Sequence, residues 1–218
     1  MGKEEEEKMI KLQELLGIKK MVYSESIKPK HKKKMSMSVK HFHEDISLPY
    51  SLGFTHKPDN DSKNTLKELN YLSKLKTDED LVKERDEVFE SFKPLVEKNK
   101  VNINLTYLEE VIKESAKYIM KMKYHYNRPR PYQVAEFYGI DLNGTTIASM
   151  KTPSYPSGHA TQGYLVAEIL TSYDPKNGKE YRKLGEEIAH SRIIAKAHYP
   201  SDKFFGEELA KVLYAGLK

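Results

Sequence analysis

The sequence contains no cysteine and no long apolar run, although it has 218 residues. The absence of cysteine excludes disulfides, thiolate metal sites and cysteine nucleophiles. No run approaches the ~20 apolar residues that cross a bilayer, which predicts a soluble protein without a transmembrane segment. The charged N-terminal segment lacks the apolar stretch of a secretory signal. We therefore expect a cytoplasmic or otherwise intracellular location, although a lack of cysteine also fits an exported protein.

The formal net charge of +5 comes from the first 40 residues, which hold 11 lysines and six glutamates. The rest of the chain is formally neutral, and the run KPKHKKK at residues 28–34 concentrates the excess. Without interleaved aromatic residues, this run is more typical of a flexible solvated arm, and we expect any polyanion contact to be weak. Leu15, Leu16 and Ile18 leave a second interpretation open, in which a short amphipathic helix docks onto the domain.

The pattern of apolar residues predicts an all-α fold. We expect a charged and flexible basic tail over residues 1–46 and one helical-bundle domain over residues 47–218, with six or seven helices. Pro94 should kink or end the second of these helices, and residues 132–156 should form a loop. The expected helices begin near Lys63, Thr77, Asn104, Ser157, Asp174 and Pro200.

Three cations could bind an anion. Lys121 and Arg128 bracket the end of a predicted helix, and Arg192 falls on the apolar face of another. A charge on a buried face is costly unless an opposite charge meets it. A buried pair with Glu186 or Glu187 would also satisfy Arg192. Three permanent cations suit a phosphate that gains negative charge in its transition state.

Two further segments carry groups suited to acid–base and nucleophilic chemistry. Ser157, Gly158 and His159 open a helix, where free backbone N–H groups and the helix dipole favour an anion. His198 precedes the last helix, and Asp202 follows it by four residues. This spacing lets the carboxylate accept one imidazole N–H and leave the other nitrogen free as a nucleophile. Asp202 could instead serve only the dipole of its helix.

The three segments together resemble the signature of the type 2 phosphatidate phosphatase and vanadium haloperoxidase superfamily. The signature reads K-x6-R-P, then P-S-G-H, then S-R-x5-H-x3-D, and the sequence matches every position. The phrases SYPSGHAT and PDNDSKNTLKELNYL are most similar to class A bacterial non-specific acid phosphatases. The resemblance implies that His198 is the nucleophile, Asp202 its orienting partner and His159 the general acid. It also implies a set of phosphate ligands, namely Lys121, Arg128, Ser157, Gly158 and Arg192.

The predicted function is a metal-independent phosphomonoesterase that acts on a small phosphate ester through a phosphohistidine. No metal or other cofactor is expected, and vanadate should bind as a phosphate analogue. A vanadium-dependent haloperoxidase is one alternative, since the same ligands hold vanadate in that branch. A non-catalytic anion or nucleic-acid binder using the basic tail is another, but it would predict a broken signature. The sequence names no physiological substrate, and it is compatible with a homo-oligomer.

Overall fold

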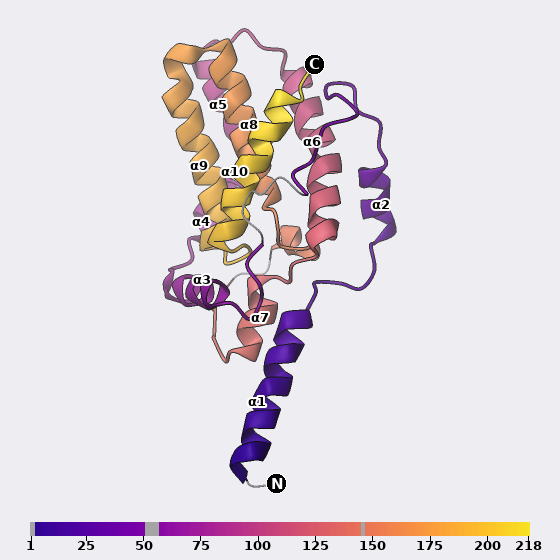
Figure 1. Ribbon diagram of the computed structural model, residues 1–218. Coiled ribbons are helices and arrows are strands. Elements are labelled where there is room, and N and C mark those ends of the chain that lie inside the picture. Colours follow the sequence, from indigo (N-terminus) through magenta and orange to yellow (C-terminus); the bar gives the residue numbers. More distant parts are fainter. Residues whose placement is uncertain (1–2, 51–56, 145–146) are drawn as a thin grey trace.

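The computed structural model describes residues 3–50, 57–144 and 147–218 of the chain (Figure 1). Within these ranges the secondary structure is helical, and the only pairing of β type is an isolated bridge between Phe42 and Leu217. The predicted all-α class is therefore confirmed. The elements are α1 (Lys3–Lys20), α2 (Pro29–Met35), α3 (Lys63–Lys74), α4 (Glu79–Glu84), α5 (Val88–Lys98), α6 (Leu105–Tyr126), α7 (Pro131–Phe137), η1 (Ala148–Lys151), α8 (Gly158–Tyr173), η2 (Pro175–Asn177), α9 (Gly178–Ile194) and α10 (Pro200–Ala215).

The helices α5, α6, α8, α9 and α10 run alongside one another and form the bundle (Figure 1). Helix α8 contacts each of the other four. Phe92, Leu165 and Phe205 are fully buried in the core between them. The backbones of α8 and α9 come close enough that a Cβ built on Gly185 would lie 2.9 Å from the carbonyl oxygen of Gly163. Glycine at this crossing thus lets α9 lie directly against α8.

Local signals set several helix ends. The Asn104 side chain accepts hydrogen bonds from the backbone N–H groups of Thr106 and Tyr107, which are otherwise unpaired in a first turn. Ser157 caps α8 through the N–H of Ala160, and Pro200 stands at the start of α10. These three predicted starts are confirmed.

Three details differ from expectation. The second predicted helix is divided into α4 and α5 by residues 85–87, and α5 continues through Pro94. Proline cannot donate a backbone hydrogen bond within a helix. The burial of Phe92 and Val96 offsets this loss and keeps α5 continuous. Helix α7 lies in the expected loop, because Pro131 fits a first helical turn. The described residues from Lys63 onward therefore form eight α-helices rather than six or seven.

Part of the predicted tail packs on the bundle. Ile18 lies in an apolar cluster with Leu69 and Leu72, and His31 and Phe42 are buried as well. Leu15 and Leu16, on the same helix as Ile18, are solvent exposed. The division of the chain at residue 47 stays a prediction, but buried side chains lie on both sides of it. No helix within the described residues is both long and apolar enough to cross a membrane.

Candidate active site

The predicted catalytic histidines face one cavity of about 410 Å³. It is bounded by α2, α6, η1, the first turns of α8 and the segment that precedes α10. His159 and His198 line it together with Lys123 and Arg130, which come from the end of α6 and the start of α7. The cavity thus joins groups from the three segments that carry the sequence signature.

Lys123 and Arg130 are buried basic side chains in the wall of this cavity. The Nζ of Lys123 donates to the carbonyl oxygen of Pro153 at 2.6 Å. Arg130 donates from Nε to the carbonyl oxygen of Thr152 at 2.7 Å and from Nη1 to His198 Nε2 at 3.0 Å. Burial lowers the pKa of Arg130 to about 10, which leaves the guanidinium charged at neutral pH. Burial, reinforced by Arg130, also lowers the pKa of Lys123 well below its ordinary value.

The structure places Lys121 and Arg128 elsewhere. Lys121 is half-buried on α6 and is not among the residues that line the cavity. Arg128 is fully buried and faces the other side of Asp202, with its Nη1 donating to Oδ1 at 2.7 Å. Its guanidinium also contacts Glu68 at 3.2 Å and lies 3.7 Å from the centre of the Tyr199 ring. Arg128 therefore neutralises the carboxylate that holds the histidine.

The sequence did contain a signal for the other pair of cations. In the run KMKYHYNRPRP, the spacing K-x6-R-P occurs twice, once from Lys121 to Arg128 and once from Lys123 to Arg130. A shift of two residues along an α-helix turns a side chain by about 200°. Only one of the two lysines can therefore point to a given cavity, and spacing alone does not decide which.

His198 and Asp202 lie as the sequence predicted. Asp202 Oδ2 accepts a hydrogen bond from His198 Nδ1 at 3.1 Å, and it also accepts from the backbone N–H of Tyr199 and from Ser154 Oγ. The Nδ1–H tautomer leaves the Nε2 lone pair facing Arg130 and the cavity. Burial alone would raise the pKa of Asp202, but Arg128 and the His198 hydrogen bond outweigh it and hold the pKa far below its usual range. Burial and Arg130 lower the pKa of His198, so its imidazole is neutral.

The segment from Ser157 to His159 reaches the cavity through Gly158 and His159, whereas Ser157 is not among the residues that line it. Ser157 is fully buried, and its backbone N–H donates to the carbonyl oxygen of Asp202 at 3.0 Å, which ties the start of α8 to α10. Gly158 lines the cavity beside His159. His159 Nε2 donates to the backbone oxygen of Asp86 at 2.9 Å. Burial, followed by the charge of Arg192, lowers the pKa of His159 to about 4.

Arg192 lies behind His159 and is paired with a carboxylate. Its Nη1 donates to Asp86 Oδ1 at 2.6 Å and its Nη2 to the carbonyl oxygen of Val82 at 2.6 Å. Arg192 is not among the residues that line the cavity, and its partner comes from another element, not from Glu186 or Glu187 of its own helix. Asp86 lies between α4 and α5 at the break in the second predicted helix, which no sequence pattern identified.

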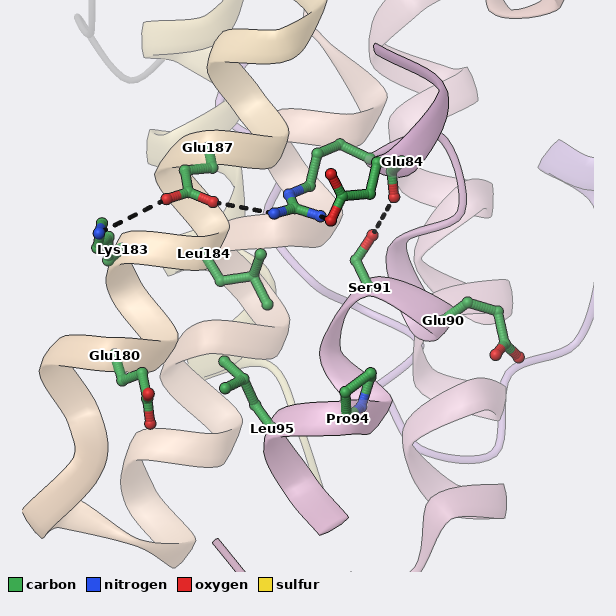
Figure 2. A pocket seen from close by; sticks show the side chains of 10 residues that line it. Glu84, Glu90, Ser91, Pro94, Leu95, Glu180, Lys183, Leu184 and Glu187 are labelled. Atoms are coloured by element: carbon green, nitrogen blue, oxygen red, sulfur yellow. Dashed lines mark hydrogen bonds and ion pairs between the residues drawn. The ribbon is translucent and has the colours of Figure 1, made fainter. Parts of the chain in front are cut away.

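A second cavity, of about 450 Å³, lies between α4, α5 and α9 (Figure 2). Its charged side chains already form ion pairs, since Arg85 contacts Glu84 at 2.7 Å and Glu187 at 3.3 Å. Leu95 and Leu184 also line it. No residue of the predicted site is part of its wall. In the part of the chain that the structure describes, no cluster of three or more histidine, aspartate or glutamate side chains is arranged to hold a metal ion.

Comparison with known proteins agrees with the sequence signature. Residues 108–213 match the model of the PAP2 superfamily. The match covers just under half of the chain. A non-specific acid phosphatase of Providencia stuartii is 34% identical to the chain over 113 residues, which cover 50% of this chain and 44% of that protein. A non-specific acid phosphatase of Salmonella typhimurium is 38% identical over 68 residues, which cover 31% of this chain and 27% of that protein.

The chain is also similar to an acid phosphatase of Zymomonas mobilis, with 34% identity over 99 residues that cover 45% of this chain and 37% of that protein. The chain thus spans less than half the length of these curated relatives. The crystal structure of a bacterial vanadium-dependent iodoperoxidase matches 75% of this chain and 51% of its own, with a TM-score of 0.55 and 16% identity. This likeness shows a shared fold.

Proposed function

We propose that the protein is a metal-independent phosphomonoesterase in which His198 forms a phosphohistidine. The position of His198 carries this proposal. One ring nitrogen is bound to Asp202 at 3.1 Å, and the other faces a cavity lined by Lys123 and Arg130. A neutral imidazole held in one tautomer is a competent nucleophile, and fixed cations stabilise the charge of the transition state. The acid phosphatases among the relatives support the choice of a phosphate ester as substrate.

The first step of the proposed reaction attaches the phosphoryl group to His198. The Nε2 lone pair attacks phosphorus, and the bond between phosphorus and the ester oxygen breaks. Arg130 moves its hydrogen bond from Nε2 to a phosphate oxygen, while Lys123 and the backbone N–H of Gly158 bind the other oxygens. The leaving alkoxide takes a proton from His159.

The second step releases phosphate. A water molecule gives a proton to the now neutral His159 and attacks phosphorus, so the bond from phosphorus to Nε2 breaks and its electron pair returns to the imidazole. His159 must be charged in the first step, although its pKa in the free site is about 4. A bound phosphate dianion raises that pKa, and acidic solution increases the charged fraction. Both effects increase the charged fraction of His159, and the second favours activity on the acidic side of neutrality.

Ser157 and Arg192 remain in the proposed set of phosphate ligands, although both are fully buried and neither lines the cavity. Two of the five N–H groups of Arg192 remain after its bonds to Asp86, Val82 and Ser191. Lys121 and Arg128 are replaced in this proposal by Lys123 and Arg130. The cavity wall holds cations and no carboxylate, a donor set suited to an oxyanion and poor for a metal ion.

A direct assay tests the proposal. Purified protein should hydrolyse an aryl phosphate in the presence of a chelator, and vanadate should inhibit it competitively. Acid-quenched protein should contain a labile phosphohistidine that His198→Ala lacks. Loss of activity with chelator and its return with a divalent cation would contradict metal independence. Full activity in His198→Ala would exclude His198 as the nucleophile. Halide oxidation by the vanadate-loaded protein with hydrogen peroxide would support the haloperoxidase alternative instead.

A further inference from the structure

The catalytic cavity holds more positive charge than a phosphate monoester needs. Besides Lys123 and Arg130, three lysines that are outside the family signature line it, namely Lys30, Lys34 and Lys151. No aspartate or glutamate is part of the wall. Several like charges around one cavity repel each other unless an anion lies between them.

Two of the additional lysines come from α2, which is anchored beside α6 (Figure 1). Lys30 and Lys34 are four residues apart and so lie on the same face of this helix. Between them, His31 is buried, and its Nδ1 is hydrogen-bonded to the hydroxyl of Tyr124 on α6. The lysines therefore project from a fixed helix and not from a free arm.

The third lysine approaches from another element. Lys151 ends η1, next to Thr152, whose carbonyl oxygen accepts from Arg130. Lys30, Lys34 and Lys151 are all exposed, and none of them forms an ion pair with another described residue. Their charges are consequently available to a ligand that enters the cavity.

An adjoining cavity of about 770 Å³ extends the available space past α2. Lys30, Lys34 and His159 line both cavities. The second is also lined by two more lysines and by three acidic residues, namely Lys33, Lys113, Asp86, Glu87 and Glu109. A molecule bound at His198 could therefore reach the lysines of α2 with a group several bonds away from the reacting phosphate.

We propose that Lys30, Lys34 and Lys151 form a second anion subsite, and that the enzyme prefers phosphate monoesters with a second phosphate group, such as sugar bisphosphates. This inference rests on the proposed phosphomonoesterase function. The reacting phosphate contacts Lys123, Arg130 and His198, while the second phosphate pairs with the exposed lysines.

The test compares two sugars that differ by one phosphate. We expect kcat/KM to be about tenfold higher for fructose 1,6-bisphosphate than for fructose 6-phosphate, since partly exposed ion pairs contribute a factor of about two to five each. Lys30→Gln/Lys34→Gln should remove most of this ratio. Lys28→Gln/Lys32→Gln is the matched control, because it removes the same charge from the same segment without touching the cavity wall. Lys151→Gln tests the opposite wall.

Binding measurements test the second anion subsite independently of the hydrolysis reaction. Calorimetry on His198→Ala, with and without Lys30→Gln/Lys34→Gln, gives Kd for both sugars without turnover. Tighter binding of the bisphosphate that disappears in the lysine variant and weakens with salt supports the subsite. Equal binding of both sugars, or a preference that the lysine variant retains, overturns it. If wild type hydrolyses no phosphate ester, the proposed function fails, and the Kd comparison still decides whether the subsite exists.

Discussion

The charge on Asp202 depends on two partners that contact it from opposite sides. His198 donates to Oδ2 at 3.1 Å, and Arg128 donates to Oδ1 at 2.7 Å. All three side chains are buried. Because Arg128 balances the carboxylate, Asp202 stays ionised and keeps the proton of His198 on Nδ1. The remaining nitrogen is then free for a reaction in the cavity.

Asp202→Asn should separate binding from turnover. An asparagine keeps the shape but not the charge, so the His198 tautomer is no longer fixed, and kcat should fall by roughly 10²- to 10⁴-fold while vanadate still binds. Stability should also fall by about 3–5 kcal/mol, because Arg128 loses its buried partner. Glu68→Gln is the control, since it removes the other carboxylate of Arg128 and leaves the contact between His198 and Asp202 intact. Steady-state kinetics and thermal unfolding at one pH measure both effects, and equal kcat values in the two variants would contradict the role of Asp202.

His159 should make the protein less stable in acid. The pKa of this imidazole is about 4 in the folded protein, because of burial and then Arg192, while an unfolded histidine has a pKa near ~6.5. The folded state therefore favours the neutral form. Neutral His159 contributes up to roughly 3 kcal/mol to the free energy of unfolding. This contribution is fully present above the unfolded pKa and is lost as the pH falls from about 6.5 to 4.

The measurement is the difference in Tm between pH 7 and pH 4.5. This difference should be smaller in His159→Gln than in wild type, since glutamine does not titrate and the other acidic and basic groups are common to both proteins. An unchanged difference would show that the pKa of His159 is not depressed by folding.

Lys123 and Lys121 provide the sharpest test of which lysine binds the substrate phosphate. Lys123→Met replaces the buried cation with an apolar side chain of similar length, and kcat/KM for an aryl phosphate should fall by about 10²- to 10³-fold. Lys121→Met is the matched substitution two residues earlier on the same helix, and we expect less than a twofold change. If Lys121→Met caused the larger loss, the first K-x6-R-P spacing would be the functional one.

At the level of helices, glycines fix how closely α8 and α10 approach around the site. A Cβ on Gly206 would lie 2.9 Å from the Cβ of Ala160 and 2.9 Å from the carbonyl oxygen of Ser157. The backbone N–H of Ser157 donates to the carbonyl oxygen of Asp202 at the same junction. The first turn of α8, which carries His159, is thus positioned by direct backbone contact with α10.

Gly206→Ala should consequently disturb both stability and catalysis. Overpacking of this kind costs about 1–3 kcal/mol, which lowers the Tm by roughly 3–10 °C in a protein of this size. We expect kcat/KM to fall as well, because α8 must shift. The control is Gly17→Ala, since a Cβ built there would meet no atom within 4 Å apart from its chain neighbours and its own helix backbone, and alanine favours a helix. A Gly206→Ala protein with wild-type Tm and activity would show that the junction is compliant.

Local sequence signals predict where the helices begin, but they do not predict the contacts between helices. Asn104, Ser157 and Pro200 act within one turn of their own position, so the starts of α6, α8 and α10 follow from the residues alone. The break between α4 and α5 depends on contacts that are distant in sequence, because Asp86 meets Arg192 106 residues later. The same limit applies to the cations near α6, where only the folded position of the helix shows that Lys123 lines the cavity.

For the molecule as a whole, the N-terminal segment joins the bundle at several points. The side chain of Asn60 donates to the backbone oxygens of Ile18 and Met21 at 3.0 and 2.8 Å. The backbone N–H groups of Lys40 and His41 donate to the Glu114 carboxylate. Charge and composition predicted a solvated arm, and the lysines from Lys11 to Lys40 are indeed exposed. The few buried side chains between them carry too weak a pattern to predict the packing.

Removal of residues 1–40 should therefore lower the Tm by several degrees and reduce the rate with an aryl phosphate. The deletion takes away the buried side chains of Ile18, His31 and Val39, and it leaves the buried side chain of Asn60 without its hydrogen-bond acceptors. Removal of residues 1–16 retains all of these contacts and should change the Tm by less than about 2 °C, since none of these buried side chains is lost.

A charge control completes this experiment. Replacing all five lysines of residues 28–34 by glutamine removes the local charge and keeps the buried side chains. We expect this variant to unfold near the wild-type Tm, so that loss of packing, not loss of charge, explains the longer deletion. If the protein without residues 1–40 kept the wild-type Tm and rate, the segment would be a dispensable arm, and the domain would begin near residue 47.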